Sequence, residues 1–152
     1  MGRRLRTGLV LALALIFGAA PSARAEDRAA TPDAYEQRLL ALVNAERAHR
    51  GLRPMRLSTC AEAYAERWSS YLARYEVFRH QSLAPMLRSC RARQVGENIG
   101  NGSVSAEAMV QTWMASPMHR ANILNPSFTY IGLGATRSSH GRWYAVQDFV
   151  GF

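Results

Sequence analysis

Two histidines and one glutamate are the side chains of this chain whose types and setting could do chemistry. His80 lies in VFRHQS, Glu97 in GENIG and His119 in SPMHRANILNPSFTYIGLG. We expect all three on irregular segments beside regular elements, where functional side chains often lie. An imidazole next to a carboxylate is half of an acid–base system, because the carboxylate fixes the tautomer and raises the basicity of the ring.

Catalysis or metal binding would need more than these three side chains. A hydrolase needs a nucleophile, and Ser82 and Ser116 are the hydroxyls nearest in sequence, but neither lies in a GxSxG elbow. Two neutral imidazoles could instead hold a divalent ion such as Zn²⁺. His80 and His119 are 119 − 80 = 39 positions apart, so only the fold could bring them together. Metal binding by this pair is therefore a hypothesis, and no cofactor is required.

Each of these residues also has a structural interpretation. His80 could simply cap or cross-link a loop. Glu97 could accept backbone N–H bonds and fix a turn, and for Glu97 this role and a role in lining a site are equally open. For Asn98, the next residue, we expect a role in holding the local backbone rather than in chemistry.

The first 25 residues have the three zones of a secretory signal peptide. Arginines precede an apolar run at positions 9–20, and small residues predict cleavage after Ala25. A membrane anchor is the alternative, but this run is shorter than the roughly 20 apolar residues that a spanning helix needs. We expect a secreted protein with no stable membrane span, in which residues 26–31 form a linker and residues 32–152 form one domain.

The basic residues of the chain are all arginines. The formal net charge is +8, and removal of four arginines with the signal peptide would leave 8 − 4 = +4. The arginines are spread along the chain and do not cluster with aromatic residues in the sequence, so they do not indicate nucleic-acid binding. A mildly basic face could meet anionic wall polymers or lipid headgroups.

Cys60 and Cys90 are the only cysteines. Disulfides persist in exported proteins, so we expect these two residues to pair. A bond that closes a loop of about 30 residues would contribute roughly 3 kcal/mol to stability on the loop-entropy estimate. The alternative is a nucleophilic thiol, which needs a thiolate-stabilising setting that neither flank clearly shows.

Helices are predicted in the first half of the domain. Thr31 and Pro32 predict the start of a helix that ends near Gly51. A second helix is predicted to open with Thr59 and Glu62 in capping-box spacing. We interpret its apolar and aromatic stripe as part of the core, with the members Ala61, Tyr64, Ala65, Trp68, Tyr71, Leu72 and Tyr75.

The second half is predicted to contain strands as well as a helix. Residues 76–94 show no clear pattern and are predicted to form a loop. Residues 95–99 are predicted to form a short strand. A third helix follows over residues 106–114. Aromatic and branched residues predict an antiparallel hairpin from strands at 128–136 and 142–150. This order indicates an α+β domain with helices packed on a small antiparallel sheet.

The ordered motifs resemble a known family. They are LVNAERAHRGLRPMRLS, FRH, GENIG, WMASPMHRANILNPSFTYIGLG and WYAVQDFVG, and they cover about Tyr35 to Phe152. In this order they are similar to secreted bacterial members of the CAP superfamily. That superfamily groups cysteine-rich secretory proteins, antigen 5 and plant pathogenesis-related proteins, and its domain is also called the SCP domain. The resemblance implies an α–β–α sandwich with a mainly antiparallel sheet and a cleft.

The resemblance also implies a role for the candidate residues. In many members two histidines and two acidic residues converge in the cleft. His80 and His119 match the two histidines, and Glu97 matches the glutamate of the GEN motif. We expect Asn98 and Ser116 to line the same cleft.

One acidic residue of the family pattern is missing. The second family glutamate usually follows the tryptophan of the central helix closely, but Trp113 is followed here by Met-Ala-Ser. Glu107 does not occupy the family position and is expected to stabilise the start of its helix through the macrodipole. The candidate site is therefore at best a triad.

Two function classes follow from the resemblance. The first is a non-enzymatic extracellular binding module for a lipid, a wall polymer or a protein. The second is a secreted hydrolase, such as a peptidase, which would use His80, Glu97 and His119 with water or a metal. We favour the first, because the second glutamate is missing and a fold alone does not confer chemistry. We also expect a monomer that does not bind nucleic acid.

Overall fold

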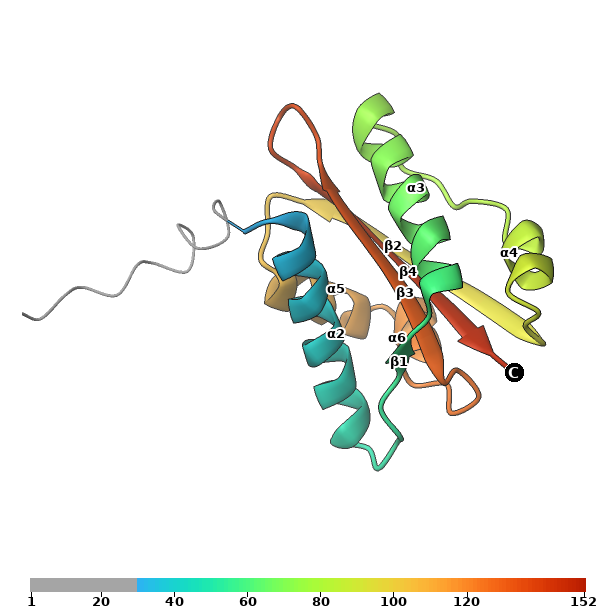
Figure 1. Cartoon of the computed structure of the whole chain (residues 1–152). Helices are drawn as coiled ribbons and strands as arrows, with labels where there is room; N and C mark the ends of the chain where they lie inside the picture. Colours follow the sequence, from blue (N-terminus) through green and yellow to red (C-terminus); the bar gives the residue numbers. More distant parts are fainter. Residues whose placement is uncertain (1–29) are drawn as a thin grey trace, which may run out of the picture.

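A computed structural model describes residues 30–152, so the predicted signal peptide and most of the predicted linker lie outside the described residues. Figure 1 shows helices on a twisted sheet. The helices are α2 (Pro32–Ala48), α3 (Thr59–Tyr75), α4 (Ala84–Ser89), α5 (Ala106–Ala115) and α6 (Pro117–Ile123). The strands are β1 (Arg56–Leu57), β2 (Gln94–Gly102), β3 (Tyr130–Arg137) and β4 (Trp143–Gly151). None of these helices is both long and apolar enough to cross a membrane.

The sheet is mixed but mainly antiparallel. Its strand order is β1-β3-β4-β2, and β4 pairs antiparallel with both of its neighbours. The predicted hairpin is therefore confirmed as β3 and β4. The two-residue strand β1, which runs parallel to β3, was not predicted. Strand β2 lies at one edge of the sheet, next to α4 and α6.

Helices cover both faces of the sheet, as Figure 1 shows for α3 in front of the strands and α5 behind them. Alternate residues of β4 explain this, since Ala145 and Phe149 join the core under α2 and α5 whereas Val146 packs in the cluster that α3 supplies. Helix α3 lies so close to β3 that a Cβ on Gly132 or Gly134 would overlap the helix backbone. The predicted α–β–α sandwich is confirmed.

Capping side chains set the starts of the first two helices. The Thr31 hydroxyl accepts a hydrogen bond from the Ala34 N–H, as expected for a cap before Pro32. At α3 the cap is Ser58 and not Thr59, because the Ser58 hydroxyl accepts from the Ala61 N–H. The predicted start of this helix was therefore displaced by one residue.

The predicted loop over residues 76–94 was partly wrong, because it contains α4. Six residues are too few to show a helical period in the sequence. The short helix buries Met86 and is tied to the start of α3 by the disulfide between Cys60 and Cys90. This disulfide confirms the predicted pairing.

The interpretation of the aromatic stripe on α3 as core was also wrong in part. Ala61, Ala65 and Leu72 are fully buried, but Trp68 and Tyr71 are only half-buried and Tyr75 is 57% exposed. The aromatic side chains follow one another along the helix, with stacked rings of Trp68 and Tyr71. Part of this stripe is therefore a surface feature.

Candidate functional site

His80 and Glu97 are in direct contact. The Nδ1 atom of His80, in the loop between α3 and α4, lies 2.5 Å from Oε1 of Glu97. The Glu97 side chain is 2% exposed, whereas that of His80 is 58% exposed. Glu97 lies within strand β2, which confirms and extends the strand predicted over residues 95–99, so only the expectation of an irregular segment was wrong. The buried carboxylate therefore fixes the orientation of the exposed imidazole.

Gln81 completes the hydrogen bonds of the Glu97 carboxylate. Its backbone N–H donates to Oε1 over 3.2 Å, and its side-chain Nε2 donates to Oε2 over 2.8 Å. The same Nε2 atom donates to Oδ2 of Asp148 over 2.9 Å. One amide therefore joins two carboxyl groups, and both oxygens of Glu97 are already in use.

Asp148 is an acidic residue that our sequence analysis did not select. It lies on β4 directly opposite Glu97 and is fully buried. Burial raises the pKa of Asp148 to about 8, the Glu97 charge adds to this effect, and the Gln81 hydrogen bond opposes it. Asp148 is therefore mainly protonated at neutral pH. A signal was present in the sequence, since an acidic residue interrupts the apolar run WYAVQDFV.

Asn98 connects strand β2 to helix α6. Its Nδ2 atom donates to the backbone oxygen of His119 over 3.1 Å and to Oε1 of Gln147 over 3.0 Å. Asn122 donates to Oδ1 of Asn98 over 2.9 Å and to the backbone oxygen of Glu97 over 3.1 Å. Asn98 is fully buried and holds the backbone around the candidate site, as we expected. Its side chain therefore does not line an open cleft, which was our other expectation for it.

His119 lies within helix α6, so the expectation of an irregular segment was wrong for this residue too. It comes to β2 from the other face of the sheet. Its side chain is partly buried, and its Nδ1 atom is buried without a hydrogen-bond partner among the described residues. Burial lowers the pKa of His119, and the positive charge of His80 lowers it further. The two imidazoles therefore interact electrostatically across the edge of the sheet, and His119 is neutral at pH 7.

Other candidate residues lie apart from this network. Ser116 precedes α6 but its side chain does not cap the helix. Within residues 30–152, neither Ser82 nor Ser116 donates a hydrogen bond to an imidazole. Glu107 pairs with Arg38 of α2 over 2.5 Å, near the start of α5 as expected, and not with the two histidines.

The donor set does not match a catalytic zinc centre. No group of three or more His, Cys, Asp or Glu side chains in the described part of the chain is arranged to hold a metal ion. His80 uses Nδ1 for Glu97, which leaves its other ring nitrogen and those of His119. Catalytic zinc sites use three protein ligands, so these residues do not fit such a centre.

Comparisons with known proteins agree with the fold. The family model described as "CAP: Cysteine-rich secretory protein family" matches residues 40–149. The Bacillus subtilis protein YkwD, itself uncharacterized, is 37% identical over 125 residues, which are 78% of this chain and 48% of YkwD. The chain thus spans about half the length of this curated relative.

Solved structures show the same architecture. An extracellular protein containing an SCP domain from Bacillus anthracis has a TM-score of 0.72 at 22% identity, over 88% of this chain and 45% of that one. A cysteine-rich secretory protein from Staphylococcus aureus has a TM-score of 0.68 at 20% identity, over 80% of this chain and 40% of that one. At this identity the likeness supports the fold alone.

Proposed function

Because this chain belongs to the cysteine-rich secretory protein, or CAP, family, we propose that it is a secreted, non-enzymatic binding domain. In this proposal the ligand contacts His80 and His119 at the edge of strand β2. One observation carries the proposal: the imidazole of His80 is exposed to solvent, whereas the carboxyl group that it contacts is buried. The side chain of His80 is 58% exposed, whereas that of Glu97 behind it is 2% exposed.

The buried carboxyl groups support binding rather than catalysis. Glu97 accepts hydrogen bonds at both oxygens from His80 and Gln81. Its side chain is only 2% exposed, so a substrate at the surface cannot reach it. Asp148 is fully buried beneath Gln81. Both acidic residues therefore position the loop that carries His80, and neither contacts the ligand.

The surroundings of the histidines favour a peptide as the ligand. Imidazole nitrogens can form hydrogen bonds with the N–H and C=O groups of a peptide backbone. Phe78 is 54% exposed and Met118 is 80% exposed, and these residues lie two positions before His80 and one before His119. An extended segment of an extracellular protein would offer both amides and apolar side chains. We propose that this binding needs no cofactor.

A secreted hydrolase is the alternative function. The His80–Glu97 contact favours it, because a carboxylate bonded to Nδ1 orients the imidazole and raises its basicity. A general base still needs a nucleophile within reach, and within residues 30–152 the hydroxyls of Ser82 and Ser116 form no hydrogen bond with either ring. Water would have to supply the nucleophile. The zinc centre that could activate this water does not fit the donor set.

Peptide binding and turnover can be measured on the same variants. We would select ligands from a displayed library of random dodecapeptides and measure their affinity by fluorescence polarisation. His80→Ala and His119→Ala are each expected to weaken binding about tenfold, since each removes a ligand-facing hydrogen bond. His140→Ala is the matched control, because this exposed histidine also bonds a glutamate, Glu76.

The same proteins would be assayed with fluorogenic peptide and ester substrates. We expect no turnover above the uncatalysed rate. Turnover that disappears in both the His80→Ala and His119→Ala variants, with an unchanged circular dichroism spectrum, would replace the binding proposal with the hydrolase. A library that yields no peptide sensitive to either substitution would also contradict the proposal.

A further inference from the structure

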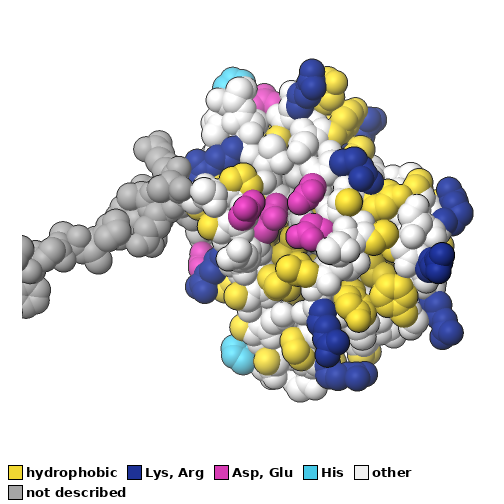
Figure 2. All heavy atoms as spheres, viewed as in Figure 1, with side chains coloured by type: hydrophobic (Ala, Val, Ile, Leu, Met, Phe, Trp, Pro, Cys, Tyr) yellow, Lys and Arg dark blue, Asp and Glu magenta, His cyan; other side chains and the backbone are white. Residues whose placement is uncertain are grey.

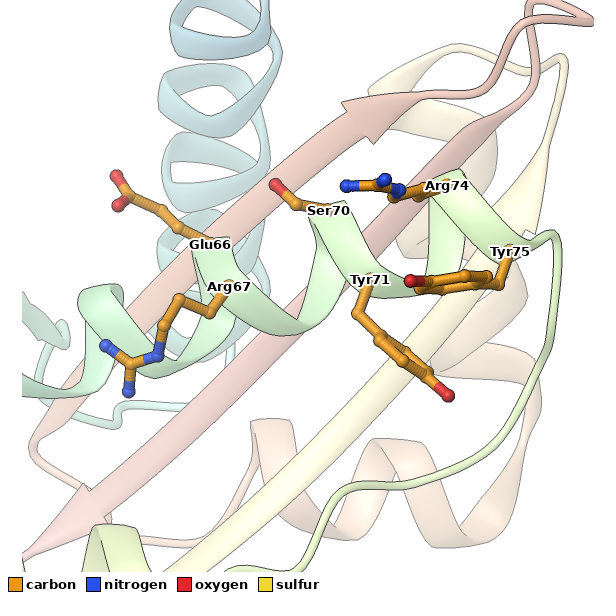
Figure 3. A pocket seen from close by; sticks show the side chains of 6 residues that line it. All are labelled: Glu66, Arg67, Ser70, Tyr71, Arg74 and Tyr75. Atoms are coloured by element: carbon orange, nitrogen blue, oxygen red, sulfur yellow. The ribbon is translucent and has the colours of Figure 1, made fainter.

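The outer face of α3 carries a groove that is separate from the two histidines. Its volume is about 560 Å³, and six side chains of this one helix line it. Figure 3 shows them projecting from α3: Glu66, Arg67, Ser70, Tyr71, Arg74 and Tyr75. The opposite face of α3 packs on β3 and β4. The groove therefore faces solvent and is not part of the core.

The two arginines of the groove are held in place but not neutralised. Within residues 30–152, neither Arg67 nor Arg74 forms an ion pair with a carboxylate, and this includes the neighbouring Glu66. The guanidinium of Arg67 lies 4.5 Å from the ring centroid of Tyr64, and that of Arg74 lies 5.6 Å from that of Tyr75. A guanidinium next to a ring keeps its planar N–H donors for an anion.

The tyrosines of the groove belong to a continuous aromatic row. The ring of Tyr71 is stacked on Trp68 at 4.9 Å and lies 4.8 Å from the ring of Tyr75. Arg79 donates a hydrogen bond to the Tyr71 hydroxyl over 2.6 Å and lies against both Trp68 and Tyr71. Tyr75 is 57% exposed at the end of this row. The row is fixed by its neighbours and presents aromatic surface to solvent.

We propose that this groove binds an acidic polysaccharide whose sugar rings carry carboxylate groups, a polyuronate. Arginine binds a planar carboxylate through two parallel hydrogen bonds. Aromatic rings offer flat apolar surface to the C–H face of a sugar. Arg67 and Arg74 are seven residues apart, which is about 10.5 Å along a helix. Linked sugar rings can extend between two such positive charges and contact the tyrosines that lie between and beside them.

The charge around the groove is mixed, because Glu66 lines it beside the two arginines and also borders an acidic pocket. We place the polyuronate on the arginine side of the groove. Figure 2 shows arginine side chains around the part of the molecule where α3 lies, although a group of acidic side chains lies beside them. A polymer of glycerol phosphate would satisfy the arginines but would offer no ring face to Tyr71 and Tyr75. A membrane would require a mainly apolar surface, whereas three of the six residues that line this shallow groove are charged: Glu66, Arg67 and Arg74. This inference does not rest on the proposed peptide site.

Calorimetric titration with polygalacturonate oligomers tests the proposal directly. We expect binding that weakens as salt is added, because salt screens exposed charges. The double variant Arg67→Ala/Arg74→Ala is expected to lose about tenfold or more in affinity, as two charge-assisted contacts are removed. Arg53→Ala/Arg88→Ala is the matched control, since it removes two exposed arginines outside the groove and should change the affinity less than twofold.

The aromatic contribution is tested separately. Tyr71→Ala/Tyr75→Ala is expected to lose affinity to a similar extent, whereas Tyr71→Phe/Tyr75→Phe keeps the rings and should retain most of it. Circular dichroism would show whether each variant is folded. Equal losses in the groove and control variants, or no binding to polygalacturonate, would overturn the proposal. Binding to phosphatidylglycerol vesicles in the absence of polygalacturonate binding would assign the groove to membranes instead.

Discussion

Glu97 and Asp148 lie directly opposite each other on the antiparallel strands β2 and β4, and both are buried. Two like charges at such a position repel each other. Burial and the charge of Glu97 raise the pKa of Asp148 to about 8, so Asp148 is mainly protonated at neutral pH. The side-chain amide of Gln81 donates hydrogen bonds to both carboxyl groups. The pair therefore carries less negative charge at neutral pH than its composition implies.

This pair predicts that the protein becomes less stable as the pH rises from about 4 to 8. The pKa of Asp148 is raised from 3.8 to about 8, so within this window the native state binds a proton that the unfolded chain has lost. The free energy of unfolding then falls by up to about 1.4 kcal/mol per pH unit from this group. The stabilisation is fully present below the unfolded pKa and is lost as the pH passes the folded pKa.

Asp148→Asn should therefore flatten the dependence of stability on pH, because asparagine does not titrate in this range. Urea unfolding between pH 5 and 9 would measure it. A smaller slope should remain, since burial raises the pKa of Glu36 to about 7, although its hydrogen bond from the Ala135 N–H opposes this. An unchanged slope in the Asp148→Asn variant would show that Asp148 is ionised throughout.

Zinc ions should not stabilise this protein at neutral pH. A ligand raises the stability of the folded state only when its concentration approaches or exceeds the dissociation constant. Two imidazoles without a third protein ligand are too few for a catalytic zinc site, so micromolar zinc should leave the melting temperature unchanged. Differential scanning fluorimetry would measure this. A rise that is lost in both His80→Ala and His119→Ala, but not in His140→Ala, would contradict it.

The parts of the fold that were predicted have clear periodicity in the sequence. The long helices α2, α3 and α5 and the hairpin of β3 and β4 repeat apolar residues often enough to be recognised. Helix α4 has six residues and β1 has two, so neither shows a period. Their formation depends on packing and on the disulfide, which the sequence pattern does not display.

The candidate site was predicted less completely, because its second carboxyl group depends on strand register. The positions of Asp148 and Glu97 differ by 148 − 97 = 51, and only the pairing of β2 with β4 places them opposite each other. The burial of the aromatic row on α3 was predicted wrongly for a related reason. Helical spacing identifies side chains that share a face, but it does not show that the single residue Arg79 packs on Trp68 and Tyr71 at the surface.

The disulfide between Cys60 and Cys90 is expected to contribute substantially to stability. It closes a sequence separation of 30 residues, for which the loop-entropy estimate is roughly 3 kcal/mol. The variant Cys60→Ala/Cys90→Ala should lose about this free energy of unfolding in urea. It should also release α4 and the neighbouring loop that carries His80, which amide hydrogen exchange would show. Two free thiols in the unreduced, native protein would contradict the pairing.

Arg47 of α2 is expected to be the most sensitive charged residue of the described chain. It is 1% exposed, and its guanidinium donates hydrogen bonds to four backbone oxygens over 2.8–3.1 Å. These oxygens belong to Arg53, Ile123, Asn125 and Phe128. They lie after α2 and around the end of α6, so this one side chain ties the helix that carries His119 to the rest of the domain.

Arg47→Ala should therefore cost about 3 kcal/mol or more in urea unfolding, because it leaves buried carbonyl groups without donors. Arg47→Lys should recover only part of this loss, since an ammonium group lacks the planar fork of donors that reaches separate oxygens. Arg50→Ala is the matched control. Arg50 forms an exposed pair with Glu46 one helical turn away, and such pairs contribute about 0.5 kcal/mol or less. Similar losses at Arg47 and Arg50 would show that the buried guanidinium does not hold α6 in place.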